Sequence, residues 1–237
     1  MDLLLNPRAP VEAMIRQGDL RGLLEKAGEL HGHFCPYVSL GVRAGVVALN
    51  ALDVRENAGM EDVVAIVETN NCFSDGIQVV TGCTFANNAL VYRDLGKTAV
   101  TLATRNGEAV RVAVRRAYAE SFLDRYPDGR ALFDKIVARR EEPTSEERQR
   151  FRRLWAEISF DQLDLAAETV FTVSRQTIDV PAFAPIKASV TCAVCGEPVM
   201  ETKARVHDGQ PVCIACASAS VYQLDGAGIG LGDAFSQ

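Results

Sequence analysis

The chain has 237 residues, of which 48% are hydrophobic and 24% charged, a composition that excludes a disordered or fibrous protein. Its net charge of -6 gives no support to a nucleic-acid-binding protein, which usually carries a basic surface. We find no basic leader segment and no apolar run of membrane-spanning length, so we expect a cytoplasmic protein that binds neither nucleic acid nor membrane.

Two helical segments are predicted in the first fifty residues. Apolar side chains recur at helical spacing over residues 12–31, where Gly18 divides the segment and Gly32 is a natural stop. A second helix is predicted over 36–52, with Pro36 at the preferred first position.

Strands and a short helix are predicted next. The strands cover 62–69, 88–93, 97–104 and 109–115, and the last three are expected to form a meander. The helix covers 75–81, with Asp75 as its N-cap and Gln78 three residues later. Asn106-Gly107 indicates a tight hairpin. This order of elements predicts an α+β domain with helices packed on a mixed or antiparallel sheet.

The later part of the chain divides into regions of different character. Residues 116–158 are expected to be helical, with Thr144 and Glu147 forming a capping box, and a further strand is predicted over 169–180. The predicted organisation is an α+β domain over 1–180, a linker over 181–187, a metal module over 188–222 and a mobile glycine-rich tail over 223–237.

Four cysteines predict a structural zinc site. Cys192-x-x-Cys195 and Cys213-x-x-Cys216 are separated by seventeen residues, and each pair presents two thiolates to one metal ion. Four sulfurs complete a tetrahedral shell, in the manner of a zinc ribbon or treble clef, although iron fits the same ligands. We expect no role for His207, which lies between the pairs, and we expect the module to contact a protein partner.

A second group of metal-binding residue types occurs in His31-Gly32-His33-Phe34-Cys35-Pro36. In an extended connector His33 and Cys35 face the same side, and Cys35 lies at a helix N-terminus, where the dipole favours its thiolate. Cys72, at another strand-to-helix junction, would complete a three-ligand site with an open position. The alternative is structural, because free cysteines are among the most buried residues.

These motifs resemble the FmdE-like family, which is named for the E component of formylmethanofuran dehydrogenase. The first motif leads into a helix containing Gly41, and the second is Cys72-x-x-Asp75-x-Ile77-Gln78-x-x-x-Gly82-Cys83-Thr84. The resemblance implies a core order of α-β-α-β-β-β, a homodimer and a transition metal, zinc or another, at the histidine–cysteine motif. It implies His33, Cys35 and Cys72 as ligands, with a pocket lined by His31, Asp75, Gln78 and Cys83.

Two positions depart from the family pattern. Tyr37 stands where glycine commonly follows Cys-Pro and is expected to narrow the pocket. Phe85-Ala86-Asn87-Asn88 replaces a Gly-Lys-Gly-Asn-like stretch, which leaves no support for anion binding by that loop.

Three functional hypotheses follow. The first is a metal-binding protein that is an accessory to an oxidoreductase, or a small catalyst, in one-carbon or redox metabolism, with His31 or Asp75 as proton carrier. The chain is too short to be a molybdopterin enzyme by itself. The second is a non-catalytic module whose zinc site recruits a partner. The third is a thiol redox protein that uses Cys35, Cys72 or Cys83.

Overall fold

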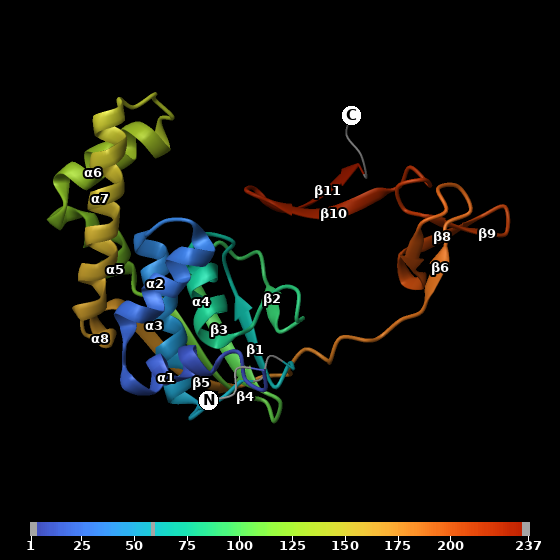
Figure 1. Ribbon diagram of the computed structural model, residues 1–237, viewed down its shortest axis with the longest axis horizontal. Helices are drawn as coiled ribbons and strands as arrows, with labels where there is room; N and C mark the ends of the chain where they lie inside the picture. The colour runs from blue at the N-terminus through green and yellow to red at the C-terminus, as the bar shows by residue number, and fades with distance from the viewer. Residues whose placement is uncertain (1–3, 58–59, 234–237) are drawn as a thin grey trace. The chain divides into compact units, whose positions relative to one another are not determined.

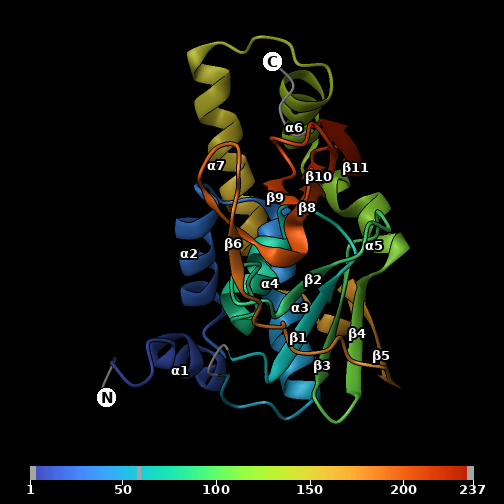
Figure 2. The same cartoon turned by 90° about the vertical axis from the view of Figure 1, so that its right-hand side faces the viewer.

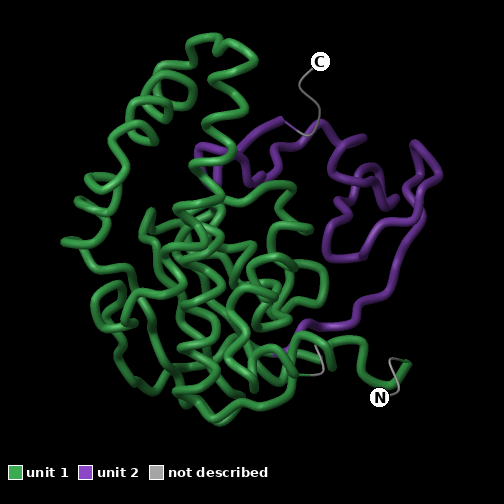
Figure 3. The backbone as a smooth tube through the Cα atoms, turned by 60° about the vertical axis from the view of Figure 1, so that its left-hand side comes forward, with its two compact units in different colours: residues 1–182 green, residues 183–237 purple. Residues whose placement is uncertain are grey.

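The computed structural model describes residues 4–57 and 60–233. The chain forms two compact units, Met1–Ala182 and Phe183–Gln237 (Figure 3), and this division falls inside the predicted linker 181–187. The first unit has the predicted α+β architecture. Among the described residues, no helix combines the length and apolar character needed to cross a membrane.

The N-terminal helices of the first unit are α1 (Ala9–Gln17), α2 (Leu20–His31), α3 (Pro36–Ala51) and α4 (Phe73–Thr81). Gly18 and Gly32 end α1 and α2 in the left-handed conformation, as predicted. Helices α3 and α4 touch backbone to backbone, since a Cβ on Gly41 would lie 2.0 Å from the Phe73 carbonyl oxygen and one on Gly76 would lie 2.4 Å from that of Val38. This crossing fixes the two helix starts that carry the cysteines.

The sheet of the first unit has five strands in the order β2-β1-β3-β4-β5 (Figure 2). The strands are β1 (Val63–Val67), β2 (Leu90–Tyr92), β3 (Ala99–Thr104), β4 (Glu108–Val114) and β5 (Phe171–Thr177). Strands β1 and β2 are parallel and the other neighbours antiparallel. The predicted meander is therefore wrong: β1, whose five residues are all buried, lies between β2 and β3. Helix α4 is the crossover that returns the chain to a parallel neighbour of β1.

Helices α3 and α4 pack against the sheet, α3 on β3 and β4 and α4 on β1. Further helical segments follow β4. They are α5 (Arg116–Ser121), a 3-10 turn (Phe122–Arg125), α6 (Pro127–Phe133), a π turn (Asp134–Ala138), α7 (Ser145–Asp161), a 3-10 turn (Gln162–Asp164) and α8 (Ala167–Val170). Thr144 and Glu147 form the predicted capping box of α7. Figure 1 shows α6 and part of α7 extending beyond the sheet.

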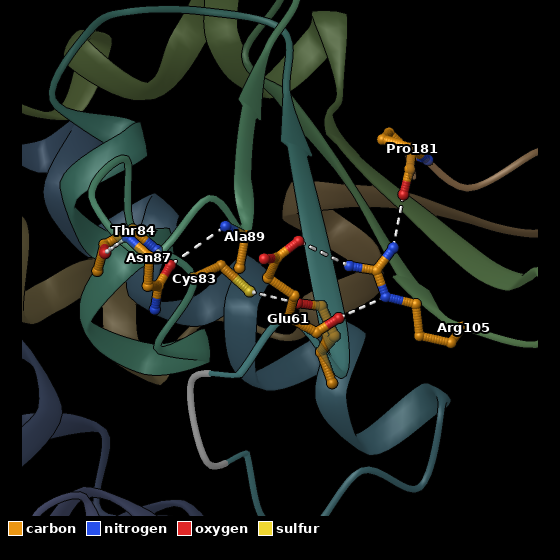
Figure 4. Close-up of polar contacts among 8 residues, drawn as sticks. Glu61, Cys83, Thr84, Asn87, Ala89, Arg105 and Pro181 are labelled. Atoms are coloured by element: carbon orange, nitrogen blue, oxygen red, sulfur yellow. Dashed lines mark hydrogen bonds and ion pairs between the residues drawn. The ribbon is translucent and has the colours of Figure 1, made fainter. Parts of the chain in front are cut away.

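The end of the first unit is tied to its sheet by Arg105. Its Nε donates to the Glu61 carbonyl oxygen at 2.5 Å, and its Nη1 donates to the Pro181 carbonyl oxygen at 2.5 Å (Figure 4). Arg105 Nη2 also donates to the Glu61 carboxylate at 3.2 Å. The chain therefore leaves the first unit from a fixed point.

The second unit consists of short hairpins. Its strands are β6 (Ser189–Thr191), β7 (Pro198–Met200), β8 (Ala204–His207), β9 (Gln210–Cys213), β10 (Ser220–Asp225) and β11 (Gly228–Asp233), with a 3-10 turn over Glu201–Lys203. The predicted mobile tail 223–237 is corrected, because β10 and β11 pair in a hairpin up to Asp233. Apolar residues between the glycines favour strand formation, although the high glycine content led us to predict a mobile segment. Residues 234–237 lie outside the described residues.

Candidate metal centres

The four cysteines of the second unit converge as predicted. Their sulfur atoms all lie within 4.8 Å of one another. Gly196, with φ of 76°, turns the first knuckle so that its N–H donates to the Cys192 carbonyl oxygen at 2.9 Å. In the second knuckle the Cys216 N–H donates to the Cys213 sulfur at 3.4 Å. The arrangement matches the closed sulfur shell of a structural zinc site.

Backbone amides at these knuckles favour thiolates. The N–H groups of Cys195 and Cys213 lower the pKa of Cys192 to about 6. The neighbouring Cys213 thiol raises the pKa of Cys216 to about 12, since adjacent sulfurs cannot all ionise without a cation. Bound zinc removes this conflict by stabilising four thiolates together. His207 instead contacts Asp208, Nδ1 to Oδ2 at 3.3 Å, and is not part of the cluster.

A second cluster lies in the first unit, at the junction of α2 and α3. His31 ends α2, Gly32 reverses the chain with φ of 85°, and Cys35 is the N-cap of α3. Ligand atoms of His31, His33 and Cys35 lie within 4.8 Å of one another, and the two imidazole ring centres are 4.4 Å apart. Two nitrogens and one sulfur form a donor set suited to zinc or another late transition metal.

The orientation of the His31 ring is set by helix α4. Its Nδ1 lies 2.7 Å from Oδ2 of Asp75, whose other oxygen accepts a bond from Gln78 Nε2 at 3.0 Å. The remaining ring nitrogen, Nε2, is buried and has no hydrogen-bond partner among the described residues. Asp75 is therefore not the helix N-cap that we predicted, because α4 begins at Phe73 with Cys72 as N-cap.

The thiols of Cys35 and Cys72 interact and titrate as a pair. Contact with the Cys35 thiol, followed by the charge of His31, lowers the pKa of Cys72 to about 6. The same contact, together with burial, raises the pKa of Cys35. Cys72 therefore contacts Cys35. Its sulfur does not belong to the group formed by the ligand atoms of His31, His33 and Cys35, which all lie within 4.8 Å of one another. Burial, followed by the charge of His31, lowers the pKa of His33 and favours the neutral, metal-binding imidazole.

The predicted pocket residues do not all meet. Cys83 follows the opposite end of α4, roughly 14 Å away by the rise of the helix, where it is fully buried and its thiol donates to the Val63 carbonyl oxygen at 3.3 Å (Figure 4). Burial raises its pKa, as expected for a core thiol. Tyr37, by contrast, lies in the first turn of α3, and burial, followed by the charges of Cys35 and Cys72, raises the pKa of its hydroxyl.

The loop that departs from the family pattern is closed by its own bonds. Asn87 Oδ1 accepts from the Thr84 N–H at 2.8 Å (Figure 4). Its Nδ2 donates to the Gly82 carbonyl oxygen at 2.8 Å. Its side chain is therefore occupied within the turn.

Two cavities in the first unit were not anticipated. One, of about 440 Å³, lies between α5 and the end of α7, and the other, of about 250 Å³, lies between α3, β4 and α5. Tyr118 and Phe122 line both cavities. Their residues come from separate stretches with no motif spacing, so the sequence carried no signal for either cavity.

In a comparison with known proteins, two family models match different parts of this chain. A family model described as "FmdE, Molybdenum formylmethanofuran dehydrogenase operon" matches residues 30–172. A model described as a prokaryotic dksA/traR C4-type zinc finger matches residues 187–222. The zinc-finger match and the convergence of four cysteines together support a structural zinc site.

One curated protein and one solved structure extend the comparison. A "Probable S-adenosyl-L-methionine-binding protein" of Archaeoglobus fulgidus is 41% identical over 217 residues, which cover 90% of this chain. The match covers only 57% of that protein's length. The crystal structure of a tungsten formylmethanofuran dehydrogenase FmdE-like protein from Syntrophus aciditrophicus has a TM-score of 0.54 at 23% identity, covering 84% of this chain and 91% of that one. It shows a shared fold.

Proposed function

Since this chain belongs to the FmdE family, we propose that it is a cytoplasmic protein whose first unit holds a second transition metal, besides the structural zinc of the second unit. We propose that it acts in one-carbon or redox metabolism, as an accessory to an oxidoreductase or as a small catalyst. The observation that supports this most directly is the buried Nε2 of His31, which lacks a hydrogen-bond partner among the described residues beside His33 and Cys35.

An unpartnered buried nitrogen is costly unless a ligand satisfies it. When Nδ1 of His31 donates its proton to Asp75, Nε2 carries the lone pair that a metal accepts. A carboxylate behind a ligating histidine is the usual outer partner at metal sites. We therefore propose His31 as a ligand and Asp75 as its positioning residue, in place of the proton-carrier roles expected from the sequence.

Three protein ligands leave a coordination position open, and a metal ion there supplies Lewis-acid polarisation of a small ligand or activates water. His31, His33 and Cys35 would hold the ion. The Cys72 sulfur, whose contact with Cys35 favours its thiolate, would complete the ligand set or accept a proton beside it. We propose that Tyr37, two residues after Cys35, restricts the space around these groups.

Metal content of anaerobically purified protein tests the proposal. We expect two equivalents per chain in the wild type, and one in Cys35→Ser with the circular dichroism spectrum unchanged. Cys83→Ala is the matched control, because it removes a buried thiol outside the cluster, and it should keep both equivalents. A wild type with one equivalent, lost on Cys192→Ala, would show that the first unit binds no metal.

A thiol redox function is a second candidate, favoured by the contact between Cys35 and Cys72. Oxidation of the two thiols to a disulfide releases two electrons and two protons to an oxidant such as oxidised glutathione. Mass spectrometry after alkylation in glutathione buffers measures this directly. A Cys35–Cys72 disulfide that forms and reduces across physiological potentials would support the redox function, whereas thiols that stay reduced throughout would exclude it.

Binding of S-adenosylmethionine is a third candidate, suggested by the name of the Archaeoglobus relative. The cavity of about 440 Å³ is of the size of small-ligand pockets. Its walls include Tyr118, Phe122 and Tyr126, on which an adenine ring can stack. Asp164 can accept from ribose hydroxyls, and the buried Oε1 of Gln162 lacks a hydrogen-bond partner among the described residues.

Calorimetry with S-adenosylmethionine tests that candidate. Phe122→Leu should weaken binding about tenfold, since stacking of a base on an aromatic ring contributes about 1–3 kcal/mol. Phe133→Leu is the control, because that ring stacks on Trp155 and does not line the cavity. Absence of heat at millimolar ligand would assign the relative's ligand to the part of its chain that this protein does not match.

We also propose a homodimer and a protein partner for the zinc module. The second unit exposes apolar side chains, including Val206 at 82%, Tyr222 at 78% and Leu231 at 67%. Large apolar side chains exposed in such number favour contact with another protein. Sedimentation equilibrium of the wild type tests the dimer. A monomer at all concentrations would exclude it.

A further inference from the structure

The cavity of about 250 Å³ is lined in part by the first two turns of α3, the helix whose N-cap is Cys35. Tyr37 and Leu40 of α3 form one wall, and Tyr37 follows the candidate ligand Cys35 by two residues. The Tyr37 and Phe122 rings meet edge to face with centres 6.2 Å apart. Leu40 is 1% exposed. This end of the cavity is therefore apolar and aromatic.

Cationic groups line the other end of the cavity. Lys97 and Arg111 both line it, from the start of β3 and from β4. Arg111 is held in place by Glu68, which accepts from Nε at 2.6 Å and from Nη2 at 2.8 Å. Such a fixed guanidinium loses little conformational freedom when it binds an anion.

Lys97 differs from Arg111 because its ammonium group forms no ion pair with the described residues. The hydrogen bond from Arg111, followed by the charges of Arg111, Lys97 and Arg93, lowers the pKa of the 6% exposed Glu68. The local charge at this end is thus positive, although the whole chain has a net charge of -6. A local excess of cations beside an apolar wall selects an anion with an apolar portion.

We propose that this cavity binds a small organic carboxylate, with its charged group at Lys97 and Arg111 and its apolar portion along Tyr37 and Phe122. The volume is below the range of drug-sized pockets, which limits the ligand to a few carbon atoms. The idea that this carboxylate is the substrate presented to the metal rests on the proposed function. The anion site itself is built from residues other than the proposed metal ligands.

Nuclear magnetic resonance titration of the labelled full chain with butyrate tests the site, with butyramide as the uncharged analogue of the same shape. We expect saturable shifts of the Thr98 and Ala119 amides with butyrate, and binding of butyramide at least tenfold weaker. Lys97→Met should weaken butyrate at least fivefold and leave butyramide unchanged. Lys26→Met is the matched control, because it removes an exposed lysine from α2 that lies away from the cavity.

Equal affinity for butyrate and butyramide, or unchanged butyrate affinity in Lys97→Met, would overturn the proposal. Tighter binding of inorganic phosphate than of butyrate at the same amides would replace the carboxylate class with a general anion site and overturn it as well. The same titration of Cys35→Ser separates the two proposals. Butyrate binding in Cys35→Ser that still depends on Lys97 would support the anion cavity independently of the metal, whereas a wild type with only one metal equivalent would refute the metal site alone.

Discussion

His31 and Asp75, separated by 44 residues in sequence, meet at 2.7 Å between Nδ1 and Oδ2. The contact joins the last residue of α2 to the first turn of α4. It is possible because α4 crosses α3 at the Gly41–Gly76 contact and so places its N-terminus beside the α2–α3 junction. The geometry of the candidate metal centre therefore depends on a helix crossing, and both can be tested.

Asp75→Asn should weaken binding of the second metal about 10- to 100-fold, because the amide cannot hold the histidine ring with a charge-assisted bond. Competition with a chromogenic zinc chelator measures the affinity. The expected loss is confined to the first unit, so the zinc of the four-cysteine module should be retained. Unchanged affinity in a protein that binds two metals would show that Asp75 does not position a ligand.

Gly41→Ala should destabilise the first unit by about 3 kcal/mol or more, since its Cβ would lie 2.0 Å from the Phe73 carbonyl oxygen and force the helices apart. Urea denaturation followed by tryptophan fluorescence reports on this unit through Trp155. Gly129→Ala is the control, because its nearest neighbour at 3.2 Å is the flexible end of Ile158. Equal stability of the two variants would contradict the backbone contact.

Removal of zinc should unfold the second unit and leave the first intact. The unit consists of short hairpins, and among its described residues only Cys192 and Val212 are buried hydrophobic residues, so metal ligation supplies most of its folding free energy. Limited proteolysis after chelation should cut after residue 183 and leave a stable fragment of the first unit. Cys192→Ala should show the same pattern without chelator. Protection of the second unit after complete zinc loss would refute this dependence.

Alkylation of the three cysteines of the first unit should be selective and pH-dependent in the metal-free protein. The thiolate is the reactive form, so modification of Cys72 should rise with pH through about 6 and level off above it. The pKa of Cys35 and that of Cys83 are both raised, and these thiols should remain unmodified at pH 7. Peptide mass mapping after brief exposure to iodoacetamide from pH 5 to 9 measures each site. Equal alkylation rates at Cys72 and Cys83 would exclude the lowered pKa that we assign to Cys72.

Local signals were sufficient for many elements. Pro36 predicted the start of α3, and Thr144 with Glu147 predicted the start of α7, because a helix terminus is set by residues within one turn. Asn106-Gly107 marked the β3–β4 turn for the same reason, and Gly107 has a φ of 91°. The zinc knuckles were also predictable from local sequence, since each places two ligands within four residues.

Contacts between distant segments were not accessible in the same way. The sequence order suggested that β2 and β3 pair, but the crossover through α4 inserts β1 between them. Asp75 has a residue type suited to a helix cap, and only the packing of α4 shows that it turns to His31 instead. Cys72 and Cys83 look alike in the sequence, yet the two ends of one helix give them different surroundings.

The sequence by itself determined the class of the protein, its family resemblance, the two-part organisation and the four zinc ligands, because these depend on composition and on spacings of a few residues. Only the tertiary structure decided which histidine nitrogen stays unpartnered, which cysteine joins the cluster and where the two cavities lie. The physical reason is that these properties arise where helices and strands from distant parts of the chain pack, and no local pattern records which side chains will meet there.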